Sequence, residues 1–180
     1  MLDFFYTIII GSISYMISAP FTEMFNNPFF ATSLRDFWSN RSNKFIQRNI
    51  AILSFKPTVR ALNYLLDIKD KKKTPGWVLM IAGMNAFIFS ALFHEVLMYF
   101  VLDGIGVEFE LTWEQFLFFG IQGVVMSFEI FVGKLFKLEI GNFLGWLWAT
   151  AVMLLTSPLF LNPLLKGNIL HLVFENLAVL

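Results

Sequence analysis

The chain has 180 residues, of which 57% are hydrophobic and only 14% are charged, and its mean hydropathy is +0.68. Such a chain lacks the polar surface that a soluble domain of this length needs, which excludes an ordinary soluble fold. The formal net charge is zero, so the charge balance indicates neither a nucleic acid nor an acidic substrate as partner. The absence of cysteine excludes disulfides and thiolate catalysis, and two histidines are too few for a histidine-rich metal site.

An apolar segment at 4–20 is the first candidate membrane span, although its 17 residues are at the short end of the range. A cleaved signal peptide and an interfacial helix are the rival interpretations. The chain begins Met1-Leu2-Asp3, and this lack of Lys or Arg before the apolar stretch argues against a signal peptide. We therefore expect a span here.

The segment that follows interleaves apolar and charged residues and predicts one or two amphipathic helices. Thr32 or Ser33 is expected to cap the first helix, with Asp36, three residues after Ser33, as the capping-box partner. Pro57 is expected to interrupt that helix, and a second helix is expected over 58–67.

Positive charge is concentrated in the same segment, because ten of the 13 Lys and Arg residues lie within 21–76. The positive-inside rule therefore places this segment on the cytoplasmic side. The charge run fits either a solvated face that contacts anionic lipid headgroups or a docking site for a phosphate-bearing cofactor.

The clearest span is Trp77 to Leu102, whose 26 residues cover about 39 Å and so exceed a hydrocarbon core of about 30 Å. It carries His94 and Glu95 side by side. An ionisable pair inside a span is costly unless it has partners, and it is a functional-site hypothesis by default. His94 lies 17 residues beyond Trp77, about 26 Å along the helix, and therefore past the membrane midplane.

The helix stripe that contains His94 is rich in small residues, which allow another helix or a ligand chain to approach closely. An imidazole on such a face is suited to act as a general base. The members of the stripe are Gly83, Phe87, Ser90, Ala91, His94 and Met98.

A third span is expected at 112–136, after an acidic connector with Asp103, Glu108 and Glu110 that fits the lumenal side. Three polar residues recur within it at seven-residue intervals and therefore share one helix face. They either bind neighbouring helices across the bundle or line a polar pocket. These residues are Gln115, Gln122 and Glu129.

The fourth span is expected at 140–165, and Pro158 and Pro163 interrupt it, which is tolerable where neighbours satisfy the freed carbonyls. Its Trp146 and Trp148 suit a membrane interface. The last 13 residues are too short to cross a bilayer, and their His171 and Glu175 are expected to interact locally. The sequence thus predicts one all-α domain over 1–180, a multi-pass membrane bundle of about four transmembrane helices with a cytosolic amphipathic helix region.

Three short motifs carry a family resemblance: ATSLRDFW at 31–38, PTV at 57–59 and SALFHE at 90–95. In this order and spacing they resemble the membrane-bound O-acyltransferase superfamily. More closely, they resemble its wax-synthase branch, the long-chain-alcohol O-fatty-acyltransferases. The resemblance covers about residues 20–160 and corresponds to the C-terminal half of family members.

The resemblance implies acyl transfer from acyl-CoA, a co-substrate rather than a resident cofactor, to a lipophilic alcohol, with His94 as the general base. It also implies a catalytic asparagine after the DFW motif, for which Asn43 is the first candidate and Asn40 the second. Asp36, Asn40 and Asn43 would share one face of a continuous helix. The nearby basic side chains would meet the CoA phosphates, and these are Arg41, Lys44 and Arg48.

The substrate-binding residues implied are Asp36, Trp38, Asn40, Arg41, Ser90 and Glu95. The resemblance further implies residence in the endoplasmic reticulum membrane, with membrane lipids as surroundings. Because family members are about twice as long, it implies an N-terminal half or a second copy that completes the reaction chamber. Two other classes of function compete: a truncated, non-catalytic membrane relative, and a small transporter or channel with His94 in a proton path.

Overall fold

The computed structural model describes residues 25–104, 112–136 and 141–166, and within these ranges every regular element is helical. The span expected at 4–20, Glu108 and Glu110 of the acidic connector, and the His171–Glu175 pair lie outside the described residues.

Three long helices form the body of the structure: α6 (Gly76–Gly104), α7 (Glu114–Phe136) and α8 (Asn142–Lys166). Each contains a stretch of 22 to 25 residues that is long and apolar enough to cross a membrane. Large apolar side chains cover their outer faces, with Phe128 61% and Leu155 81% exposed, as lipid-facing helices require. The expected membrane helical bundle is confirmed, with three of the about four expected spans within the described residues.

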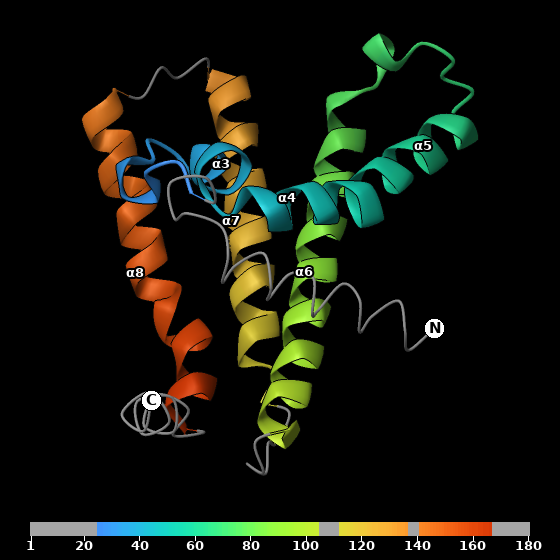
Figure 1. Cartoon of the computed structure of the whole chain (residues 1–180). Coiled ribbons are helices and arrows are strands. Elements are labelled where there is room, and N and C mark those ends of the chain that lie inside the picture. The colour runs from blue at the N-terminus through green and yellow to red at the C-terminus, as the bar shows by residue number, and fades with distance from the viewer. Residues whose placement is uncertain (1–24, 105–111, 137–140, 167–180) are drawn as a thin grey trace.

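Helix α7 lies between α6 and α8, and it packs against both (Figure 1). The helices alternate in direction along the chain, so the N-terminal ends of α6 and α8 lie at the same end of the bundle as the C-terminal end of α7 (Figure 1). Lys134, near the end of α7, accordingly reaches Gly76 at the start of α6.

Helix α8 accommodates Pro158 by local repair. A proline removes the amide donor that would bond the carbonyl four residues earlier. That carbonyl belongs to Leu154, and the Ser157 hydroxyl donates to it at 2.9 Å. The expectation that a proline is tolerable inside this span is therefore borne out at this position, by a side chain of the same helix.

A series of short helices lies across the upper ends of α7 and α6 in Figure 1. It begins with the 3-10 turn η1 (Pro28–Phe30), continues through α3 (Leu34–Asp36) and a π-helical turn η2 (Phe37–Arg41), and then turns sharply. Next come α4 (Lys44–Ile50), a second π-helical turn η3 (Ala51–Phe55) and α5 (Lys56–Leu65). The short 3-10 helix η4 (Lys71–Lys73) leads into α6.

The expected interruption at Pro57 is wrong, because α4, η3 and α5 follow one another without a break from residue 44 to 65. The wide π turn ends just before Pro57 and gives the ring room that a regular α turn does not provide. The second helix also ends earlier than expected, at Leu65, because Asp67 adopts a left-handed conformation and Ile68 N–H closes the helix end on the Asn63 carbonyl.

Polar side chains fasten this series to α6. Asn85 of α6 donates to the hydroxyls of Ser54, at 3.1 Å, and Thr58, at 2.8 Å. Thr58 is the central residue of the PTV motif, and its hydroxyl also donates to the Ser54 carbonyl. The PTV motif therefore helps to attach these short helices to the helix that carries His94.

Candidate active site

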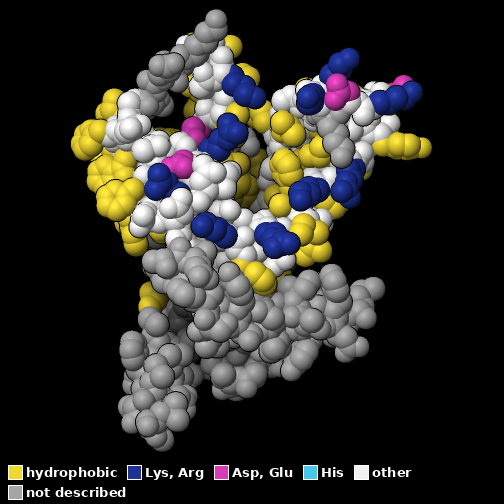
Figure 2. All heavy atoms as spheres, turned by 45° about the horizontal axis from the view of Figure 1, so that its top comes forward, with side chains coloured by type: hydrophobic (Ala, Val, Ile, Leu, Met, Phe, Trp, Pro, Cys, Tyr) yellow, Lys and Arg dark blue, Asp and Glu magenta, His cyan; other side chains and the backbone are white. Residues whose placement is uncertain are grey.

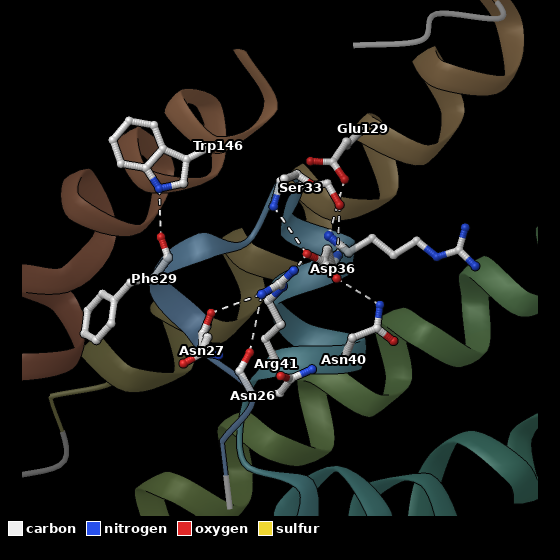
Figure 3. A network of polar contacts seen from close by, with 11 residues as sticks. Asn26, Asn27, Phe29, Ser33, Asp36, Asn40, Arg41, Glu129 and Trp146 are labelled. Atoms are coloured by element: carbon white, nitrogen blue, oxygen red, sulfur yellow. Dashed lines mark hydrogen bonds and ion pairs between the residues drawn. The ribbon is translucent and has the colours of Figure 1, made fainter. Parts of the chain in front are cut away.

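The DFW motif folds into a compact segment, residues 26–41, that is held by its own hydrogen bonds (Figure 3). Ser33 is extended and its hydroxyl accepts a hydrogen bond from Asp36 N–H at 2.8 Å, which confirms Ser33 as the N-cap of α3. The Asp36 carboxylate accepts in return from Thr32 N–H at 3.3 Å. The reciprocal bond of the expected capping box is therefore made with the residue before the N-cap and not with Ser33 itself.

Asp36 is the centre of this segment. Its carboxylate accepts hydrogen bonds from the Asn40 amide at 3.0 Å and from the Arg41 guanidinium, which in turn donates to the Asn27 carbonyl (Figure 3). Partial burial alone would raise the pKa of Asp36, but the hydrogen bonds from Asn40, Arg41 and Thr32 outweigh it and hold the pKa below its ordinary value of 3.8. Asp36, Asn40 and Arg41 thus shape the segment.

Asn43 stands apart from Asp36 and Asn40. The chain is extended at Ser42, and Asn43 begins the next helix as its N-cap, its side-chain oxygen accepting from Phe45 N–H and Ile46 N–H at 3.0 and 3.2 Å. The expectation that Asp36, Asn40 and Asn43 share one helix face is therefore wrong. The i, i+4, i+7 spacing assumes a continuous helix and so could not reveal the break. The break occurs at Asn43 because Asn favours a capped helix start over a helix interior.

Glu129 of α7 binds this segment to the bundle. Its carboxylate accepts from Leu34 N–H at 3.0 Å and from Arg35 N–H at 3.3 Å, in the first turn of α3, and from the Trp148 indole of α8 at 3.0 Å. A carboxylate at a helix N-terminus satisfies free amides and favours the helix dipole. Figure 3 shows Glu129 directed at the start of α3.

Helix α8 holds the segment from its other side. The Trp146 indole donates to the Phe29 carbonyl at 2.7 Å (Figure 3). Gly145 lies so close to the Thr32 carbonyl that a methyl group in its place would overlap that oxygen. Both tryptophans expected at a membrane interface therefore also bind protein groups.

Trp38 connects the segment to the bundle core. Its indole donates to Gln122 of α7 at 3.2 Å, and Gln122, which is completely buried, donates to the Thr156 hydroxyl of α8 at 2.8 Å. The Trp38 ring also packs edge-on against Phe87 and Phe118 and at an angle against Phe119. Trp38 is therefore fixed both by a buried hydrogen-bond chain and by an aromatic cluster.

His94 lies at the far side of this cluster from Trp38 and is partly buried. Its imidazole packs on Phe119 of α7, with ring centroids 4.5 Å apart, and edge-on against Phe160 of α8 at 5.6 Å. The Gln115 side chain is a neighbour of the imidazole. Ser90, one turn earlier on α6, is 5% exposed and belongs to the same inward stripe.

Glu95 is 3% exposed, and its Oε1 accepts from Phe116 N–H at 3.2 Å, in the first turn of α7. Among the described residues, its Oε2 is one of the few buried side-chain oxygens without a hydrogen-bond partner. Within that part of the chain, no three His, Asp or Glu side chains gather as metal ligands would.

The three polar residues spaced by seven on α7 all bind neighbouring segments. Gln115 donates to the Phe160 carbonyl of α8, while Gln122 and Glu129 reach both α8 and the DFW segment. Bonds across the bundle, one of the two interpretations of this spacing, are therefore confirmed. Sequence reasoning missed Phe119 and Phe160 as neighbours of His94, because nothing distinguishes them among 23 phenylalanines.

Together these features define a membrane protein with a partly buried histidine packed against two neighbouring helices of its bundle, and with a polar segment docked at one end of the helices. A model of the membrane bound O-acyl transferase family matches residues 21–121, more than half of the chain. The chain belongs to this family, and the resemblance expected from its three motifs is confirmed.

Relatives support the same branch. The chain is 28% identical over 172 residues to an Arabidopsis thaliana protein named "Probable long-chain-alcohol O-fatty-acyltransferase 8", and the match covers 95% of this chain and 48% of the relative. It is 30% identical over 110 residues to the long-chain-alcohol O-fatty-acyltransferase of Simmondsia chinensis, which covers 61% of this chain and 28% of the relative.

A third relative is the acyl-CoA–sterol O-acyltransferase 1 of Arabidopsis thaliana, which is 27% identical over 110 residues, covering 61% of this chain and 28% of the relative. The chain spans about half the length of two curated relatives that it matches over 95% of its own length. No solved structure matches it.

Proposed function

We propose that this chain carries the general base, His94, of an acyl-CoA-dependent O-acyltransferase that esterifies a long-chain or other lipophilic alcohol. The observation that carries the proposal is the placement of the imidazole against the rings of Phe119 of α7 and Phe160 of α8. Relatives named for acyl transfer to long-chain alcohols and to sterol support this class of substrate.

The reaction needs one proton to move. His94 takes the proton of the alcohol while the hydroxyl oxygen attacks the thioester carbonyl. The new C–O bond forms, the C–S bond breaks, and the proton passes from the imidazolium to the CoA thiolate. The rings of Phe119 and Phe160 keep water from their side of the imidazole, and in the completed chamber this would favour the alcohol over water as the attacking group.

The face at the top of Figure 1 suits the CoA portion of the substrate. Figure 2 shows a hollow there, with hydrophobic side chains inside it and Lys and Arg side chains around it. Exposed basic residues of the surrounding short helices are Arg35, Lys44, Arg48, Lys56 and Arg60. Phosphates would bind at this rim, while the thioester and acyl chain extend inward toward His94.

The remaining site residues then have distinct roles. Trp38 is the part of the DFW segment that forms the wall facing the aromatic cluster around His94, and Ser90 and Glu95 contribute polar groups inside the bundle. Asp36 and Arg41 act on the substrate indirectly, by shaping the segment that carries Trp38. Asn43 remains our first candidate for the second catalytic residue, with Asn40 second, and Asn43 would act from the start of α4.

The basic rim supports our proposal that these short helices lie on the cytoplasmic side, where acyl-CoA is available, and we propose the endoplasmic reticulum as the membrane. The relatives are longer, so we propose that the wall opposite His94 comes from an N-terminal half of the kind they contain or from a second copy of this chain. The whole site would then be enclosed on all sides.

The test is ester synthesis by membranes that contain the chain, alone and together with the N-terminal half of a relative. Radiolabelled palmitoyl-CoA is offered with a fatty alcohol or a sterol. We expect ester formation that falls by about 10²- to 10⁴-fold in His94→Ala, the usual contribution of a general base. His171→Ala, which changes the other histidine, is the matched control and keeps the activity. Equal ester formation by His94→Ala and the parent contradicts the proposal, and so does an absence of ester with either alcohol, both from the chain alone and from the chain combined with the N-terminal half of a relative.

A further inference from the structure

Two neighbouring pairs of residues meet where α6 passes the start of α7. On α6 the pair is His94 and Glu95, and on α7 it is Gln115 and Phe116. Glu95 accepts from Phe116 N–H at 3.2 Å, and the Gln115 side chain lies beside the imidazole of His94. Glu95 therefore fixes the first turn of α7 against α6, and this places Gln115 opposite His94.

The orientation of the Gln115 amide is set from a third helix. Its Nε2 donates to the Phe160 carbonyl of α8 at 3.2 Å. The reverse orientation would bring two oxygens together, so this contact assigns the nitrogen and the oxygen of the amide. With Nε2 engaged by α8, Oε1 is the amide atom that is available to the imidazole.

The oxygen of Gln115 needs a donor. Gln115 is 1% exposed, and its Oε1 has no hydrogen-bond partner. A buried acceptor without a partner costs about 1–3 kcal/mol. The imidazole N–H of the neighbouring His94, which packs against the same Phe160 that Gln115 contacts, is a candidate donor, and contacts of catalytic groups commonly shorten when substrate binds.

We propose that Gln115 is a positioning residue for His94: its Oε1 accepts the imidazole N–H and so selects one tautomer. The other ring nitrogen is then unprotonated, as a base must be. This second step rests on the proposed function, whereas the choice of tautomer does not. The rings of Phe119 and Phe160 hold the plane of the imidazole, and Gln115 fixes which nitrogen carries the proton.

Gln122 provides a matched control. It is the same residue type on the same face of α7, is also completely buried, and also donates to α8, through Thr156. Its oxygen, however, accepts from the Trp38 indole and not from His94. Replacing either glutamine by leucine removes a buried amide between α7 and α8, but only one of the two changes is expected to affect the imidazole directly.

The test uses the full chain with His171→Gln, which leaves His94 as the single histidine. Nitrogen-15 spectra of the imidazole in detergent micelles distinguish the two tautomers. We expect one tautomer in this parent and in the Gln122→Leu form, and a mixture in Gln115→Leu. Gln115→Glu, which retains an acceptor oxygen, keeps the parent tautomer. A tautomer that is unchanged in Gln115→Leu, or a mixture already in the parent, overturns the proposal.

Kinetics separates this inference from the proposed function. In Gln115→Leu we expect kcat to fall by about 10- to 100-fold, with KM for acyl-CoA nearly unchanged. This loss is smaller than the roughly 10⁴-fold loss seen when a Ser-His-Asp catalytic triad loses the aspartate that orients its histidine, because Gln115 is uncharged. A tautomer shift without ester synthesis by any form leaves Gln115 as a positioning residue and refutes the function. Ester synthesis with an unchanged tautomer and kcat in Gln115→Leu refutes only the role of Gln115.

Discussion

Removing the carboxylate of Glu129 should release the DFW segment from the bundle. Three donors converge on that carboxylate: Leu34 N–H, Arg35 N–H and the Trp148 indole. The free-energy cost of losing these hydrogen bonds differs, because Leu34 is completely buried, whereas the Trp148 side chain is 41% exposed and can bond to water instead.

The magnitude follows from that difference. A buried donor left without its partner costs about 1–3 kcal/mol, and the two exposed donors add little, so Glu129→Ala should weaken docking by about 2–3 kcal/mol. This corresponds to a shift of roughly 30- to 150-fold in the docking equilibrium. Glu129→Gln keeps one acceptor oxygen but turns an NH₂ group toward a donor, and an intermediate effect is expected.

Limited proteolysis measures this equilibrium, because cleavage of a locally open segment follows the population of the open form. Trypsin has sites within the segment, at Arg35 and Arg41. Cleavage there should accelerate in the order parent, Glu129→Gln, Glu129→Ala. Lys134→Gln, which alters a charge on the same helix without removing an acceptor from the segment, is the control. Parent-like cleavage of Glu129→Ala would show that this carboxylate does not hold the segment.

Two further predictions concern the same segment. Gly145→Ala places a methyl group against the Thr32 carbonyl and should undock the segment, which faster tryptic cleavage would report; Gly133→Ala, where the added methyl meets nothing within 4 Å, should instead gain up to about 1 kcal/mol of helix stability. Because the pKa of Asp36 lies below 3.8 in the folded chain, its carboxylate stabilises the segment above pH 3.8 and loses this effect as the pH falls through the folded pKa. The Asp36→Asn form should therefore be cleaved faster than the parent at pH 7. In pepsin digestion the two cleavage rates should converge as the pH falls below 3.8 and through the folded pKa; a difference that persists at the lowest pH would show that ionisation of Asp36 does not cause the difference.

The local features of the chain were readable from its residues. Ser33 caps its helix as expected, since a serine three residues before an acidic residue satisfies the free amides of a first turn regardless of tertiary context. The long apolar runs predicted about four spans, and three of them are helices able to cross a membrane within the described residues, because backbone groups in lipid must be satisfied within the helix. The motifs around Asp36, Pro57 and His94 indicated the family.

Spacing alone misled where the helix was not regular. Asn43 was placed on one face with Asp36, yet it caps a new helix, and Pro57 was expected to end a helix that continues through a π turn. The two errors have different causes. The grouping of Asn43 with Asp36 assumes about 3.6 residues per turn across a point where one helix ends and a new one is capped. The interruption at Pro57 assumes a regular α turn, whereas a π turn gives the proline ring room.

The sequence by itself determined that the chain is a membrane helical bundle, that His94 lies within a span, and that Gln115, Gln122 and Glu129 share a helix face. Only the tertiary structure decided what each of the three meets: the imidazole and α8, Trp38 and Thr156, or the start of α3. The physical reason is that hydropathy and periodicity fix which side of a helix turns inward, whereas partners depend on the register between helices. That register is set by close contacts such as Gly145 against Thr32, which involve residues far apart in the chain.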